Sequence, residues 1–176
     1  MLSLDELTKY LQASGKPMDY DGAFGGECVD VIKYLLDLTY GVKPGRIGNA
    51  NELWDDKYGI LKSTWFFRIE GNKDMRKGDI IFLNTGISFK HVGLFMEEKA
   101  NTVLVFDQVG NGDKVWGELS PAYREWSKSI VMGIWRHKNA VPNPTIDFAN
   151  KYWIRKRGND EYFSCYEILS ILAKLK

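Results

Sequence analysis

The sequence of 176 residues contains only two cysteines, Cys28 and Cys165. Two thiols do not make the disulfide framework of a small secreted domain, and neither lies in a CxxC pair or a spacing typical of zinc ligands. Cys165 lies in the apolar helical run DEYFSCYEILSILAKL, where a buried, unreactive thiol is expected. Cys28 stands among glycines and acids instead, so it needs a separate explanation.

An excess of charge of one sign is also missing, because 24 Lys and Arg face 23 Asp and Glu. A net charge of +1 does not give the basic field with which many proteins bind nucleic acid. No uninterrupted apolar run approaches the roughly 20 residues that span a bilayer. The first residues, MLSLDELTKYLQASG, contain acids and differ from a signal peptide. We therefore expect synthesis in the cytoplasm, no membrane insertion, and some other route for any export.

What the sequence does contain is a change of pattern from helices to strands. The first part predicts a helix over 3–13, in which Ser3 and Glu6 form a capping box, and a second helix over 28–41 that ends at Gly41. A short helix begins at Asn49 or Asn51 and is anchored by Trp54. Strands are then expected at 63–70, 78–83, 91–97, 101–109 and 129–137. This order predicts an α+β fold, with N-terminal helices packed on an antiparallel sheet.

A proline-containing break, VPNPT, interrupts the chain after the last predicted strand. It divides the sequence into a domain at 1–140, a linker at 141–146 and an aromatic, basic segment at 147–176 that ends in a helix. The C-terminal segment matches no binding module, so its role as a wall-binding appendage, an oligomerisation helix or part of the domain's packing stays open.

The loop DYDGAFGGECVD has the spacing of a 12-residue calcium loop. Counted from Asp19, Asp21 is third, Ala23 is fifth, Gly25 is seventh and Asp30 is twelfth. Such loops use a backbone carbonyl at the seventh position and a carboxylate at the twelfth. The match to an EF-hand is partial, and a solvated acidic turn is the alternative interpretation.

Cys28 is expected at the start of the helix that follows this loop, where backbone amides favour a thiolate. A nucleophilic cysteine needs a base, and the chain has only two histidines. His137 ends a strand beside Arg136 and Lys138 and is interpreted as a structural surface residue. His91 begins a strand and is the better candidate.

A hairpin symmetric about Lys99 would place Phe95 opposite Val103 and His91 opposite Asp107. Directly opposed residues have Cβ atoms about 5 Å apart on one face of the sheet. A carboxylate there could fix the imidazole tautomer and stabilise its protonated form, although a purely structural His–Asp pair has the same pattern. Cys, His and acid then follow one another in the order found in papain-like thiol hydrolases.

Together these segments resemble a CHAP domain, the cysteine, histidine-dependent amidohydrolase/peptidase family of peptidoglycan hydrolases. The resemblance covers roughly 15–137 and is carried by GGECVDVIKYLLDLTYG, GNANELWD, KGDIIFL, HVGLFM and VLVFDQ, in the family's order. It implies a papain-like fold, with Cys28 as nucleophile, His91 as general base and Asp107 as the orienting acid. Many members carry Glu at that acidic position.

The chain departs from the family's pattern at several positions. Many members have Asn two residues after the acid, where this chain has Val109, so Gln108 and Asn111 are alternatives for the third member of the triad. Many also have Gln directly before the nucleophile, where its amide helps to hold an oxyanion; here Glu27 stands instead. We expect Trp116, in the polar stretch NGDKVWGE, to lie near the substrate groove.

The resemblance also implies a structural Ca2+ and a function. The calcium ligands would be the side chains of Asp19, Asp21 and Asp30 and the carbonyl oxygens of Ala23 and Gly25. The implied enzyme cleaves an amide of the peptidoglycan stem peptide, cross-bridge or muramoyl-alanine link. It would be a phage or prophage lysin, released through a holin pore or carried on a virion. The alternatives are an inactive CHAP-like module for wall attachment or assembly, and a cytosolic thiol hydrolase of small amides. The oligomeric state stays open.

Overall fold

The computed structural model describes residues 1–109 and 120–140. The chain separates into two units, Met1–Ala140 and Val141–Lys176, and the second lies outside the described residues. The predictions for Asn111, Trp116, Cys165, the linker at 141–146 and the segment at 147–176 therefore fall outside the described part of the chain. Within residues 1–109 and 120–140, no helix has the length and apolar character needed to cross a bilayer.

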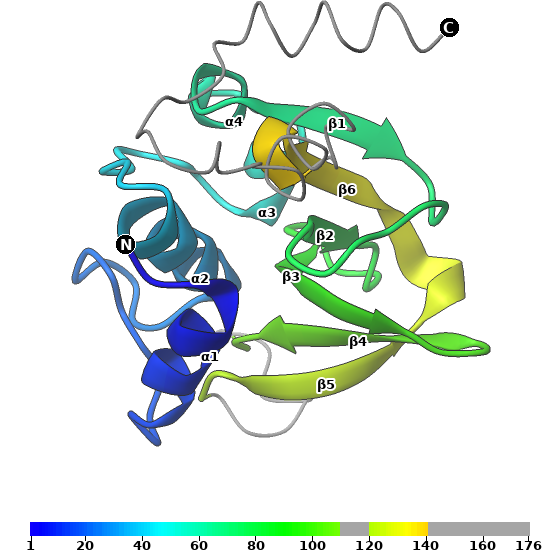
Figure 1. The fold of residues 1–176 in the computed structure, drawn as a ribbon, viewed down its shortest axis with the longest axis horizontal. Helices are drawn as coiled ribbons and strands as arrows, with labels where there is room; N and C mark the ends of the chain where they lie inside the picture. The colour runs from blue at the N-terminus through cyan, green and yellow to red at the C-terminus, as the bar shows by residue number, and fades with distance from the viewer. Residues whose placement is uncertain (110–119, 141–176) are drawn as a thin grey trace, which may run out of the picture. The chain divides into compact units, whose positions relative to one another are not determined.

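The helices of the first half begin largely where the sequence predicts (Figure 1). Ser3 caps the first helix and forms a capping box with Glu6, and Asn49 caps the short helix α3. Gly41, with a φ of 69°, follows the end of the second helical segment and donates its N–H to the Asp37 carbonyl. The last turn of that segment is a wider π-helix. The helical elements are α1 (Leu4–Gln12), α2 (Cys28–Tyr34), the π-helix η1 (Leu35–Thr39), α3 (Ala50–Trp54) and α4 (Ile60–Ser63).

The second half forms a six-stranded antiparallel sheet in the order β1-β6-β2-β3-β4-β5. The α+β class and the N-terminal helices packed on an antiparallel sheet are confirmed. The strands are β1 (Phe66–Glu70), β2 (Ile80–Leu83), β3 (His91–Glu98), β4 (Thr102–Asp107), β5 (Ala122–Ser127) and β6 (Val131–His137). Short 3-10 turns, η3 (Lys128–Ile130) and η4 (Lys138–Ala140), precede and follow β6.

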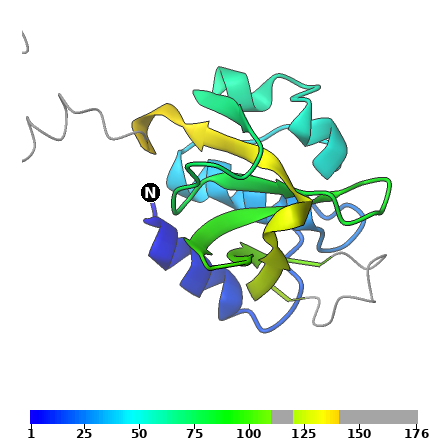
Figure 2. The ribbon, with the colours of Figure 1, turned by 90° about the vertical axis from the view of Figure 1, so that its right-hand side faces the viewer.

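The two faces of the sheet carry separate apolar clusters. On one face, alternate residues such as Phe82, Leu94 and Phe106 join the core formed with α1, α2, η1 and α3. Viewed from the side of the sheet, α2 lies behind the central strands (Figure 2). The opposite face carries a smaller cluster around Phe95 and Trp126. Trp54 is buried in the larger core against Phe82, as expected of the anchor of α3.

The register predicted for the β3–β4 hairpin was wrong by two residues. Phe95 pairs with Val105, not with Val103. Nearer the turn, a bulge between Phe95 and Glu97 shifts the pairing by one more residue, so that Glu97 pairs with Leu104. His91 is therefore not directly opposite Asp107. The error is an even number of residues, and side chains alternate with a period of two, so both residues still lie on the same face.

One strand was not predicted from the sequence. β5 has the sequence AYREWS, in which two adjacent charged residues separate two aromatic ones, and only Trp126 in it is buried. Its pairing with β4 makes β5 the edge of the sheet next to the acid at the end of β4.

Gly93 of β3 allows the close approach of β4. A Cβ atom at this position would lie 2.5 Å from Val105 Cγ1, 2.8 Å from Asp107 Cβ and 2.9 Å from the Phe106 carbonyl oxygen. We predict that Gly93→Ala lowers the free energy of unfolding by about 1–3 kcal/mol, because the new methyl overpacks the hairpin. Urea denaturation followed by circular dichroism measures the change.

Gly45→Ala is the matched control, since a Cβ there meets nothing within 4 Å. Equal stability of the Gly93 and Gly45 variants would contradict the close packing of β3 on β4.

Candidate active site

Cys28 is the first residue of α2, and Glu27 is the N-cap of this helix. The Glu27 backbone N–H donates to Asp30 Oδ2 at 2.8 Å, which fixes the chain at the point where it enters the helix. The thiol is free and partly exposed. The first amides of a helix lack intrahelical partners and carry a partial positive charge, so this position favours a negatively charged sulfur.

His91 is the first residue of β3 and is only 3% exposed. Its Nε2 lies 2.9 Å from Asp107 Oδ2, and its imidazole also forms a hydrogen bond with Cys28. Burial alone would lower the pKa of His91, but the hydrogen bonds and charges of Asp107 and Cys28 outweigh it and raise this pKa to about 10. The imidazole is therefore held in its protonated form.

The His91–Asp107 contact is diagonal across the hairpin. Asp107 lies against Gly93, two residues along the strand from His91. Diagonal neighbours are farther apart than opposed ones but within reach of longer side chains. Because Gly93 has no side chain, nothing on that residue stands between the imidazole and the carboxylate.

Asp107 is fully buried and is held by β5 as well as by His91. Arg124 Nη1 donates to Asp107 Oδ1 at 2.6 Å and to its carbonyl oxygen at 2.9 Å. Trp126 Nε1 donates to Oδ2 at 2.8 Å, and the Trp126 ring lies 5.1 Å from that of His91. A buried carboxylate is costly unless it is paired and hydrogen-bonded, and these donors satisfy it in one orientation. Sequence reasoning missed both residues, because it did not identify their strand.

Gln108, the next residue, does not take the place of the acid. Its side-chain amide donates to the carbonyls of Met18 and Glu27, at 2.9 and 3.1 Å, and accepts from the Met18 N–H at 2.6 Å. Gln108 is completely buried and braces the loop that leads to Cys28. Of the two described candidates for a partner of His91, the geometry favours Asp107. Val109 is buried and apolar.

A cavity of about 430 Å3 lies beside Cys28. Its lining includes Ala23, Phe24 and Glu27 of the loop and Phe89 and Lys90, which directly precede β3. Phe24 and Phe89 are 88% and 63% exposed, so the cavity has apolar edges open to solvent. Burial and the nearby charge of Asp30 raise the pKa of Glu27, which favours its protonated, hydrogen-donating form compared with an ordinary glutamate.

The acidic loop before Cys28 gathers three carboxylates. One oxygen from each of Asp19, Asp21 and Asp30 lies within 4.8 Å of the others, a spacing that suits a hard, oxygen-liganded cation. Lys33 Nζ lies 2.8 Å from Asp21 Oδ2 and 2.9 Å from Asp30 Oδ1. Burial alone would lower the pKa of Lys33, but its bonds to Asp21 and Asp30 raise it, so the ammonium is charged. Lys33 is a further residue that sequence reasoning did not single out.

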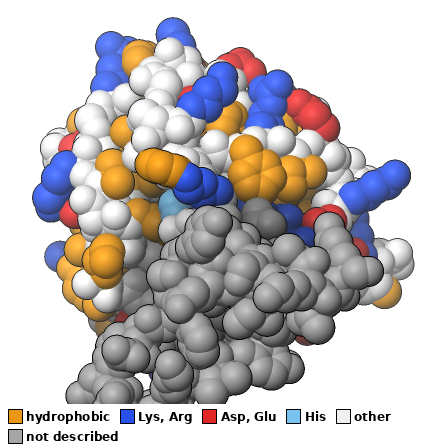
Figure 3. All heavy atoms as spheres, turned by 45° about the horizontal axis from the view of Figure 1, so that its top comes forward, with side chains coloured by type: hydrophobic (Ala, Val, Ile, Leu, Met, Phe, Trp, Pro, Cys, Tyr) orange, Lys and Arg blue, Asp and Glu red, His pale blue; other side chains and the backbone are white. Residues whose placement is uncertain are grey.

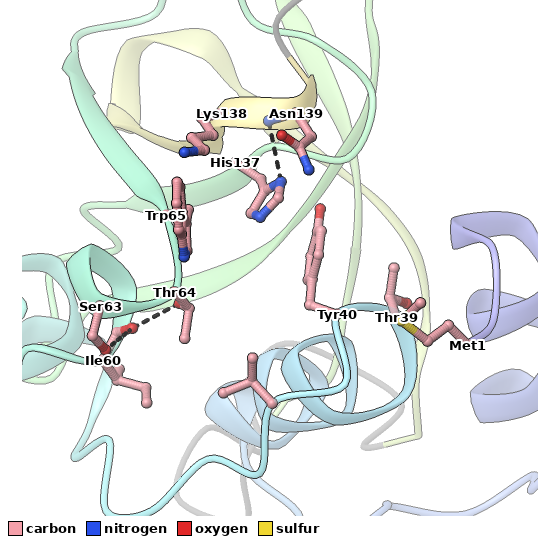
Figure 4. Close-up of a pocket in the computed structure, with 11 residues that line it drawn as sticks. Met1, Thr39, Tyr40, Ile60, Ser63, Thr64, Trp65, His137, Lys138 and Asn139 are labelled. Carbon is pink, nitrogen blue, oxygen red and sulfur yellow. Dashed lines mark hydrogen bonds between the residues drawn. The ribbon is translucent and has the colours of Figure 1, made fainter. Parts of the chain in front are cut away.

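A larger cavity, of about 850 Å3, has none of Cys28, His91 or Asp107 in its lining. Figure 4 shows His137 there, with its ring near Tyr40 and its Nδ1 accepting from the Asn139 N–H. The His137 and Tyr40 rings stack with centroids 4.3 Å apart. His137 thus packs as a structural residue. On the face drawn in Figure 3, basic and acidic side chains are interspersed with hydrophobic ones among the described residues.

Comparison with known proteins shows a likeness at the level of the fold. No model of a known protein family matches the chain, and no curated protein matches it. Among solved structures, the crystal structure of a wild-type endolysin, LysIME-EF1, superposes with a TM-score of 0.55 at 23% sequence identity. The match covers 80% of this chain and 67% of that one. At this identity, the likeness shows that the two chains share a fold.

The thiol–imidazole pair predicts unusual reactivity of Cys28. We expect alkylation by iodoacetamide to fall about tenfold or more in His91→Ala, because the sulfur loses its positively charged partner. Peptide mapping by mass spectrometry follows Cys28 separately from Cys165.

His137→Ala is the matched control, because it removes the other histidine and leaves the contacts of Cys28 intact. A similar slowing in both variants would show that the reactivity does not come from the His91 contact.

Proposed function

We propose that this protein is a CHAP-type cysteine hydrolase that cleaves an amide bond in bacterial peptidoglycan, as a phage or prophage lysin. The observation that carries the proposal is the contact series from Cys28 to His91 to Asp107 beside an open cavity. The same chain shares its fold with an endolysin, which is a lytic phage enzyme by name. The order of the three residues and the sequence motifs around them support the same family.

The first chemical step follows from this geometry. The Cys28 sulfur, as a thiolate, attacks the carbonyl carbon of the scissile amide, and the carbonyl electrons move onto oxygen. The Cys28 backbone N–H, in the first turn of α2, would donate to that oxyanion. Glu27 lines the wall of the same cavity, next to the nucleophile in the sequence.

His91 then acts as the acid and afterwards as the base. It donates its proton to the amide nitrogen, the C–N bond breaks, and the amine leaves a thioester on Cys28. A water molecule loses a proton to His91 and attacks the thioester, which releases the carboxylic acid and restores the thiolate–imidazolium pair. Asp107 keeps the imidazole in one orientation through both steps, and Arg124 and Trp126 keep Asp107 in place.

We also propose that the loop from Asp19 to Asp30 binds Ca2+ in a structural role. The carboxylates of Asp19, Asp21 and Asp30 are close enough to share one ion, and the carbonyl oxygens of Ala23 and Gly25 would complete its shell. Such an ion would tie the loop to the beginning of α2, since Asp30 belongs to that helix. It has no part in the bond-breaking steps.

The hydrolase proposal predicts that Cys28→Ala abolishes the clearing of purified cell walls, whereas Cys165→Ala retains it. His91→Ala should reduce the rate by about 100-fold or more, because both proton transfers depend on the imidazole. Turbidity measures the rate, and mass spectrometry of the products identifies the bond: new N-terminal amines indicate an endopeptidase and released lactyl groups an amidase. Wall clearing by Cys28→Ala would refute the nucleophile. Intact wild-type protein without activity on any wall would favour a binding module.

The calcium proposal predicts that Asp19→Asn weakens Ca2+ binding about tenfold or more, because affinity in such loops depends on the number of charged ligands. Isothermal calorimetry with CaCl2 measures it. Asp55→Asn is the control, since Asp55 is exposed and its nearest cation, Arg68, is 4.0 Å away. Equal affinity in the two variants would place any bound calcium elsewhere.

A further inference from the structure

The ammonium group of Lys33, a residue of α2, lies against the carboxylates of the acidic loop, where a bound cation would lie. Its ammonium contacts Asp21 at 2.8 Å and Asp30 at 2.9 Å, and its side chain is only 9% exposed. Asp30 precedes Lys33 by three residues on the same helix, while Asp21 comes from the loop. One side chain therefore bridges the loop and α2, which is the task proposed above for a calcium ion.

One oxygen of each of the three carboxylates is engaged with the backbone. Asp19 Oδ1 accepts from the Gly22 N–H, Asp21 Oδ1 accepts from the Ala23 N–H, and Asp30 Oδ2 accepts from the Glu27 N–H. Lys33 contacts the other oxygen of Asp21, Oδ2, and the other oxygen of Asp30, Oδ1. An ion that binds these oxygens has to compete with the ammonium group.

We propose that Lys33 is an internal cation of the acidic loop, and that a divalent ion binds there only by displacing its ammonium. The proposal rests on the calcium site proposed above and is independent of the hydrolase activity. Three carboxylates and one ammonium leave a formal charge of −2, so the loop attracts a further cation even while Lys33 is in place. In the absence of an ion, the ammonium keeps the loop joined to α2.

The cavity beside Cys28 offers space for the displaced Lys33 side chain. Lys33 and Asp21 both line the 430 Å3 cavity that also contains Cys28 and Glu27. A rotation about the flexible lysine side chain moves the ammonium from the carboxylates toward this cavity. Binding of the ion would thus add a positive charge to the cavity beside the nucleophile, which connects the loop to the substrate site.

Calorimetric titration with CaCl2 tests the competition, in a Cys28→Ala background so that no turnover occurs. We expect Lys33→Met to bind Ca2+ about tenfold or more tightly than its parent, because no ammonium has to be displaced. Its melting temperature should also become dependent on Ca2+, while that of the parent changes little on chelation. Lys43→Met is the matched control, since it removes a lysine that pairs with Asp37 outside the loop. It should bind Ca2+ within about twofold of the parent.

Equal or weaker binding by Lys33→Met, or the same gain in Lys43→Met, would overturn the proposal. Absence of Ca2+ binding in all variants would remove the calcium site and the competition together and would leave the hydrolase proposal intact. NMR of the lysine ammonium groups in the Cys28→Ala parent gives a second measurement that does not depend on the folding of Lys33→Met. The Lys33 signal should shift as calcium saturates the protein, and an unchanged signal would contradict displacement.

Discussion

The arrangement of the site depends on one buried carboxylate. Asp107 has no exposure to solvent, so its charge must be compensated by protein groups alone. His91 compensates it from β3, and Arg124 and Trp126 do so from β5. The three donors are brought together only because β4 lies between β3 and β5 in the sheet. The compensation of the Asp107 charge therefore requires this strand order. The strand order in turn sets the orientation of the His91 imidazole.

The sequence allowed much of the fold to be predicted, because its strongest signals are local. The caps at Ser3 and Asn49 follow from side-chain chemistry within four residues. The apolar strands follow from their composition. β5 was not predicted because only one of its side chains is buried, and its pairing with β4 is what makes it a strand. The hairpin register was wrong because a bulge depends on packing across the pair, which a count of residues does not reveal.

The site was partly predictable for the same reason. Cys28 at the start of a helix, and His91 and Asp107 on neighbouring strands, could be expected from element order. An error of two residues kept His91 and Asp107 on one face, and the absence of a side chain at Gly93 allows their diagonal contact. Arg124 and Trp126 could not be inferred, because they come from the strand that was not recognised. Lys33 could have been noticed, since it lies three residues after Asp30 on the helix that follows the acidic loop.

Asp107 and Gln108 are consecutive residues with opposite orientations, because side chains alternate along an extended chain. Asp107 holds the imidazole of His91, and Gln108 holds the backbone of Met18 and Glu27, next to the thiol. The base and the backbone beside the nucleophile are thus both held by two consecutive residues, Asp107 and Gln108. The end of β4 therefore contacts both the base and the loop segment that carries the nucleophile, and so sets their relative position. Two adjacent residues at the end of one strand thus fix the distance between the nucleophile and its base.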